Sequence, residues 1–119
     1  MGPGWVLETV ITDKTGVGQI ARQHVQAFKY HTQYYPYYHV NVRQCDGGVL
    51  FGPATHGKYQ GVKRELERSG KPFIENPTVA ELQDFILTRS IRTLFVYGPD
   101  LKPVREQVDT VLAQGLLPF

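Results

Sequence analysis

The chain has 119 residues, of which 41% are hydrophobic and 20% are charged. These values exclude a disordered chain, and the length suits one domain over residues 1–119 that buries roughly two-thirds of its unfolded surface. The net charge of +2 comes from 13 basic and 11 acidic residues spread along the chain, so no polybasic segment predicts binding to nucleic acid.

The single cysteine, Cys45, excludes an intrachain disulfide and a zinc site built from cysteines. No apolar run approaches the roughly 20 residues that span a bilayer, and residues 1–5 lack the basic-then-apolar order of a signal peptide. We therefore expect a cytoplasmic protein that contacts no membrane and needs no metal.

The first third of the chain alternates between strand and helix patterns. Residues 5–12 are rich in β-branched and aromatic side chains and predict a buried strand, which runs into a turn at 13–16. From Val17 the apolar residues recur at helical spacing, which predicts a helix to about Thr32. Residues 37–42 then predict a short strand.

The middle of the chain continues this alternation. Residues 49–51 form a short apolar run that predicts a central parallel strand. A helix should start at Thr55 or His56 and end at Gly70, because a glycine commonly follows a helix. Residues 73–74 predict a minimal strand.

The last third has the clearest helix start. Thr78 and Glu81 have the spacing of a capping box, so a helix should begin there. Residues 93–97 predict the last strand, and residues 102–115 predict the last helix. Short apolar strands that alternate with helices predict a single Rossmann-like α/β domain, with a mostly parallel sheet of about five strands and helices on both faces.

Three strand-to-helix turns are candidates for a ligand site, because open parallel sheets bind ligands beyond the carboxyl ends of their strands. The first turn supplies Thr12, Lys14, Thr15 and Gly16. Its glycines let backbone N–H groups approach an anion, although the turn lacks the spacing of a Walker loop. An ordinary capped turn is the alternative.

The second turn supplies Thr55, His56, Gly57 and Lys58. A lysine in the first turn of a helix opposes the helix dipole unless an anion lies nearby, which favours a phosphate site. A solvated surface lysine is the alternative.

The third turn supplies Tyr97 and Gly98. Arg43 and Asp46 precede a predicted strand, so either they face the ligand or they pair with each other. No catalytic set is evident, since the histidines lack a paired spacing and Cys45 has no base beside it. The residues therefore favour binding over catalysis.

A resemblance extends over nearly the whole chain. The segments Thr15-Gly16-Val17, Asn41-Val42-Arg43 with Asp46-Gly47, Gly70-Lys71-Pro72 and Gly98-Pro99, in this order, resemble the molybdenum-cofactor carrier family in the SLOG group of Rossmann-like domains. The resemblance implies a non-catalytic carrier or sensor of a phosphate-bearing ligand, either molybdopterin-type or a nucleotide. The chain departs from the family at His56-Gly57-Lys58, where relatives have Gly-Gly-Thr, and at Phe95, where an asparagine is common.

Members of this group usually self-associate, so we expect a dimer or larger assembly. Trp5 and the tyrosine cluster at residues 34–38 should supply an exposed aromatic surface for that contact. A surface that binds another protein through these tyrosines is the plainest alternative function.

Two further functions stay open. One is a sequestering protein for a cyclic nucleotide or an ADP-ribose-type immune signal, of the kind a phage could encode. The other is an N-glycosidic hydrolase or transferase that acts on nucleotides. The second lacks the Pro-Gly-Gly-x-Gly-Thr loop and the Arg/Glu pair of the cytokinin-activating relatives.

Overall fold

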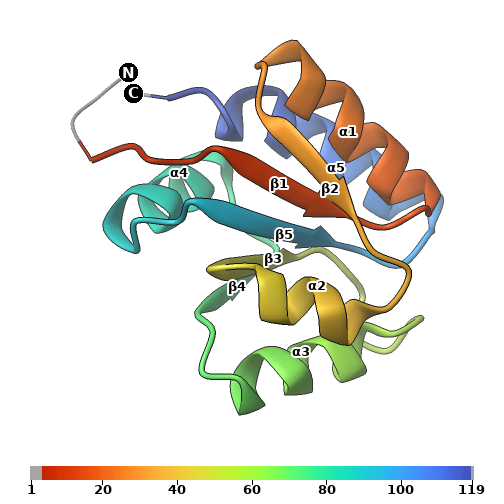
Figure 1. Ribbon diagram of the computed structural model, residues 1–119. Coiled ribbons are helices and arrows are strands. Elements are labelled where there is room, and N and C mark those ends of the chain that lie inside the picture. The colour runs from red at the N-terminus through yellow and green to blue at the C-terminus, as the bar shows by residue number, and fades with distance from the viewer. Residues whose placement is uncertain (1–3, 119) are drawn as a thin grey trace.

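The computed structural model describes residues 4–118, which form one five-stranded parallel sheet in the order β2-β1-β5-β3-β4 (Figure 1). The strands are β1 (Thr9–Thr12), β2 (His31–Tyr34), β3 (Gly47–Leu50), β4 (Phe73–Glu75) and β5 (Thr93–Tyr97). The helices are α1 (Gly16–Ala27), α2 (Tyr38–Gln44), α3 (Tyr59–Arg68), α4 (Val79–Thr88) and α5 (Lys102–Gly115). The predicted α/β fold with a parallel sheet is confirmed.

The helices divide into two layers, one on each face of the sheet. Side chains of α2 and α3 form one core with Phe95 and Tyr97 of β5, whereas α1, α4 and α5 form the other core with Val10 and Leu94. Figure 1 shows α2 beside α3 on one side of the sheet and α1 beside α5 on the other. Within residues 4–118 no helix is both long and apolar enough to cross a bilayer.

Helix α1 ends earlier than the sequence pattern predicts. Lys29 adopts a left-handed backbone with φ 64°, and the N–H of Tyr30 donates to the carbonyl of Val25 at 3.0 Å. This geometry closes the helix as a Schellman motif usually does, although the residue at that position is a lysine and not a glycine. The predicted helix to Thr32 is therefore wrong in its last turn, and β2 begins at His31.

The predicted strand at residues 37–42 is wrong, because Tyr38–Gln44 form helix α2. Val42 and Cys45 are buried in the core beneath the helix, and residues three apart on a helix share one face. Packing against the sheet thus overrides the strand preference of valine and tyrosine.

The starts of β1 and α3 lie a few residues later than the sequence predicts. Strand β1 starts at Thr9, although Trp5 upstream is buried with only 3% of its surface exposed. The indole N–H of Trp5 donates to the hydroxyl of Tyr30 at 3.0 Å, so Trp5 does not supply the exposed surface predicted for self-association. Helix α3 starts at Tyr59, later than predicted, and the central strand of the sheet is β5.

The predictions for the last third of the chain are confirmed. Thr78 accepts from the N–H of Glu81, whose carboxylate accepts from the N–H of Thr78, and α4 follows this capping box. Strand β5 and helix α5 have the predicted bounds. The carboxyl ends of β1, β3 and β5 therefore lie at one edge of the sheet, as the site argument requires.

Candidate functional site

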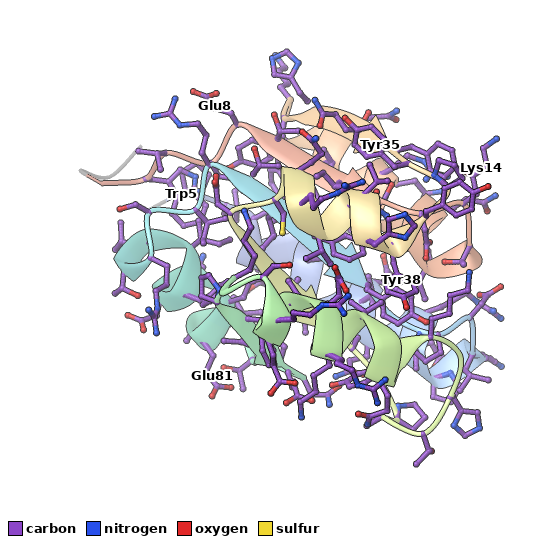
Figure 2. All side chains as sticks on the ribbon, turned by 60° about the horizontal axis from the view of Figure 1, so that its bottom comes forward. Trp5, Glu8, Lys14, Tyr35, Tyr38 and Glu81 are labelled. Atoms are coloured by element: carbon purple, nitrogen blue, oxygen red, sulfur yellow. The ribbon has the colours of Figure 1, made fainter. Side chains whose placement is uncertain are left out.

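A cavity of about 440 Å³ lies at the carboxyl ends of β1 and β5, on the face of the sheet that α2 and α3 cover. Segments that follow four different strands converge on it. The lining residues are Asp13, Lys14, Thr15, Tyr34, Pro36, Tyr38, Asn41, Gly57, Lys58, Phe95, Tyr97, Pro99 and Asp100. Figure 2 shows Lys14 and Tyr38 toward one end of the molecule, and Trp5 and Glu81 toward the other.

Five predicted site residues line this cavity: Lys14, Thr15, Gly57, Lys58 and Tyr97. They come from all three of the predicted turns. The structure therefore brings together the turns after β1, β3 and β5, which are far apart in the sequence.

Five other predicted residues lie near this edge of the sheet but outside the lining, and one of them is Gly16, the first residue of α1. Thr12 is buried at the end of β1, where its hydroxyl accepts from the guanidinium of Arg22 at 3.0 Å. Gly98 is buried, and Thr55 and His56 are exposed in the loop before α3, 3.3 Å apart between Oγ1 and Nδ1.

Arg43 and Asp46 do not border the cavity. Asp46 precedes β3, and its Oδ2 accepts from the backbone N–H groups of Arg92 at 3.1 Å and Thr93 at 2.9 Å. This carboxylate therefore holds the amino end of β5, at the opposite edge of the sheet. Within residues 4–118 no ion pair joins it to Arg43, which is exposed near the end of α2.

At the start of α1, side chains of this chain already accept hydrogen bonds from backbone N–H groups. Asp13 Oδ1 accepts from the backbone N–H of Thr15 at 3.0 Å and from its hydroxyl at 2.5 Å, and that hydroxyl accepts from the N–H of Gly18. The guanidinium of Arg105, together with the N–H of Gly16, holds the pKa of Asp100 below its ordinary value. A phosphate at this helix start would have to compete with two carboxylates of the chain itself.

The start of α3 is different, because no carboxylate occupies it. Lys58 is the residue before the helix, its side chain makes no capping hydrogen bond, and the first turn has no acidic residue. The N–H of Lys58 donates to the hydroxyl of Tyr97 at 2.8 Å. Burial raises the pKa of Tyr97, so this phenol is neutral at physiological pH.

Gly57 fits this turn for two reasons. Its φ of +58° lies in the left-handed region, which side chains other than glycine rarely adopt. A Cβ at this position would also lie 3.0 Å from the hydroxyl of Tyr97. A glycine at position 57 therefore allows this backbone conformation without a tight contact with Tyr97.

Aromatic residues line the part of the cavity formed by β2, α2 and β5. Phe95 and Tyr97 are buried neighbours on β5, and Tyr34 and Tyr38 come from the tyrosine cluster. The ammonium group of Lys14 lies 5.0 Å from the centre of the Tyr34 ring, which is the geometry of a cation–π contact.

Asn41 is the polar side chain in this part of the cavity that sequence reasoning missed. It is 1% exposed, and its Nδ2 donates to the carbonyl of Tyr35 at 3.3 Å. Its Oδ1 is buried and has no hydrogen-bond partner within residues 4–118. An unpaired buried acceptor costs about 1–3 kcal/mol, so a hydrogen-bond donor at Oδ1 would stabilise this side chain.

No protein-family model and no curated protein matches the chain. Among solved structures it is similar to the crystal structure of a putative molybdenum carrier protein from Syntrophus aciditrophicus SB, with a TM-score of 0.74 and 15% sequence identity. The match covers 94% of this chain and 96% of that chain. A likeness at this identity shows a common fold alone, so the function must be argued from the site.

Proposed function

We propose that this protein binds a phosphate-bearing small molecule, nucleotide-like or pterin-like, in the cavity at the carboxyl edge of the sheet and performs no reaction on it. The observation that carries the proposal is the start of α3, which has no capping side chain and no acidic residue and is flanked by Lys58. The N-terminus of a helix attracts anions, and a lysine beside it adds a full positive charge.

The charges in the cavity favour the same ligand. Asp13 and Asp100 are engaged by Thr15 and Arg105, whereas neither Lys14 nor Lys58 forms an ion pair within residues 4–118. An anion in the cavity would therefore gain two charge-assisted contacts without breaking an existing pair.

The size and the walls of the cavity suit an organic group beside the phosphate. A volume of about 440 Å³ is within the range of roughly 300–1,000 Å³ that is common for ligand sites. Tyr34, Tyr38 and Phe95 offer aromatic surface against which a flat heterocycle can stack. This supports a nucleotide or a pterin rather than a free phosphate ion.

The similar fold of a putative molybdenum carrier protein favours transport or storage as the role of this binding. We therefore extend the proposal to a carrier that holds its ligand in the cytoplasm and self-associates. The alternative role, sequestration of a nucleotide signal, would use the same cavity.

Native mass spectrometry of freshly purified protein tests the proposal. We expect a mass excess of a small organic phosphate that disappears in denaturing solvent, and phosphorus-31 NMR of the released material should show its phosphate. The proposal fails if the protein carries no such ligand and also binds no nucleoside monophosphate, pterin phosphate or molybdopterin compound in calorimetric titration.

A further inference from the structure

The side chain of Asn41 is held in one orientation by a contact on one side only. Its Nδ2 donates to the carbonyl of Tyr35, which can only accept. If the amide were flipped, Oδ1 would face the carbonyl oxygen of Tyr35, and two acceptors repel each other. The hydrogen bond therefore assigns the nitrogen to the position beside Tyr35 and the oxygen to the other position. Asn41 therefore presents an acceptor, Oδ1, that has no partner within residues 4–118.

We propose that Oδ1 of Asn41 accepts a hydrogen bond from an exocyclic amino group on the heterocycle of the ligand. The inference rests on the proposed function and narrows its ligand to amino-substituted nitrogen heterocycles. A site built to accept such a bond discriminates against an analogue without the amino group, because that analogue leaves the acceptor unpaired.

The surroundings of Asn41 favour a heterocycle over a phosphate. Tyr38 lies one turn earlier on α2, and the fully buried Phe95 lies on β5 below it, so the neighbouring cavity wall is aromatic. An amide oxygen repels a phosphate oxygen, since both are acceptors. The lysines that attract a phosphate, Lys14 and Lys58, come from other loops of the cavity.

The burial of Asn41 restricts which groups can reach it. Asn41 lines the cavity but is only 1% exposed, and its Oδ1 is buried, so a ligand group reaches this atom only from within the cavity and with a small shift of the side chains around it. A flat amino-substituted ring stacked on tyrosine or phenylalanine can place its amino group at the ring edge, in the plane in which an amide oxygen accepts.

Calorimetric titration with matched ligand pairs tests this inference on the full chain. In three pairs a hydrogen replaces the amino group: AMP and purine riboside 5′-monophosphate, GMP and IMP, and CMP and zebularine 5′-monophosphate. In the fourth pair, pterin and lumazine, an oxo group replaces the amino group and a ring nitrogen gains a hydrogen. We expect the amino-bearing member of at least one pair to bind the wild-type protein about tenfold more tightly or better.

Asn41→Leu should abolish this preference while the member without the amino group keeps its affinity within about threefold. Gln44→Leu is the matched control, because Gln44 is an exposed amide at the end of the same helix and outside the cavity. It should keep the full preference. Thermal melts of both variants report whether each is folded.

The outcomes separate this inference from the proposed function. Equal affinities within every pair for the wild-type protein would overturn the inference without needing any variant, and would leave phosphate-ligand binding standing. A preference that persists in folded Asn41→Leu would also overturn it, because the amino group would then be recognised elsewhere. If no probe binds and no ligand is retained on purification, both proposals fail.

Discussion

The backbone N–H of Lys58 donates to the hydroxyl of Tyr97 across 2.8 Å. Lys58 precedes α3 and Tyr97 ends β5, so this bond holds the loop after β3 against the neighbouring strand. The ammonium group of Lys58, in contrast, forms no ion pair within residues 4–118. The backbone of Lys58 is thus fixed by the fold while its charge remains available to a ligand.

Lys58→Ala should weaken binding of the phosphate-bearing ligand by roughly 1.5–3 kcal/mol, the range for hydrogen bonds to charged groups. The stability of the unliganded protein should stay the same or rise slightly, because a cation at a helix start opposes the dipole. Calorimetric titration and thermal melts measure the two effects. Lys102→Ala is the control, since Lys102 lies exposed in the first turn of α5 and outside this cavity. Equal affinities of wild type and Lys58→Ala would remove this residue from the site.

Gly57→Ala should destabilise the protein more than Gly70→Ala. Both glycines have a left-handed backbone, with φ of +58° and +67°, so each substitution should cost about 1–2 kcal/mol for that conformation. Only at Gly57 would the new Cβ also press on Tyr97, whereas nothing lies within 4 Å of the position at Gly70. Urea unfolding of both variants measures the difference, and equal losses would show that Tyr97 moves away at no cost.

Asp46→Ala should lower the free energy of unfolding by about 1–3 kcal/mol, because two backbone N–H groups at the start of β5 lose their acceptor. Ligand affinity should not change, since Asp46 is remote from the cavity. Asp84→Ala, on the exposed face of α4, is the control for loss of a carboxylate. A loss of affinity in folded Asp46→Ala would restore the ligand role that the sequence predicts for it.

Cys45 should be inert toward thiol reagents in the folded protein. Its side chain is 1% exposed, its Sγ donates to the carbonyl of Val42, and burial raises its pKa to about 11. With that pKa roughly one thiol in a thousand is ionised at pH 8. The rate of modification by Ellman's reagent at pH 8 should therefore follow urea unfolding, and rapid modification without urea would contradict the buried position.

The protein should form a dimer or larger assembly. Tyr37 is 62% exposed and Tyr34 is 37% exposed, and within the described residues the edge strand β2 pairs with β1 alone. Exposed aromatic side chains beside a free strand edge suit contact with a second copy. Light scattering at micromolar concentration should show the assembly, and Tyr37→Lys should weaken it. A monomeric wild-type protein would contradict this prediction.

The ends of the helices show how far the sequence could predict this fold. Helix α3 ends at a left-handed Gly70, and the glycine made that end predictable. Lys29 and Ser90 adopt the same conformation after α1 and α4, with φ of 64° and 51°, and nothing in their chemistry indicates it. The end of α1 and the start of β2 were missed because a lysine, unlike a glycine, does not indicate a left-handed helix end.

The candidate site likewise contains residues that the sequence predicts and residues that it does not. Gly57, Lys58 and Tyr97 were predictable because strand-to-helix turns in a parallel sheet meet at one edge. Asn41 was missed because the residues around it have strand preference and the sequence did not reveal helix α2. Helix α2 packs against β5, far away in the sequence, and local patterns do not predict such a contact. The prediction that Asp46 faces the ligand differs from the structure because a polar residue before a strand can accept hydrogen bonds from the neighbouring strand instead of from a ligand.

The place of β5 at the centre of the sheet sets the moment at which the chain can fold during its synthesis. This strand holds β1 on one side and β3 on the other, yet it is the last of the five to leave the ribosome. Until residues 93–97 emerge, no strand joins the pair β1 and β2 to the pair β3 and β4. The pairing of β1 and β3 with β5 also brings together residues that are far apart in the sequence, which slows folding. The cavity, whose walls come from both pairs of strands and from the segment after β5, therefore forms only after residues 93–100 have left the ribosome.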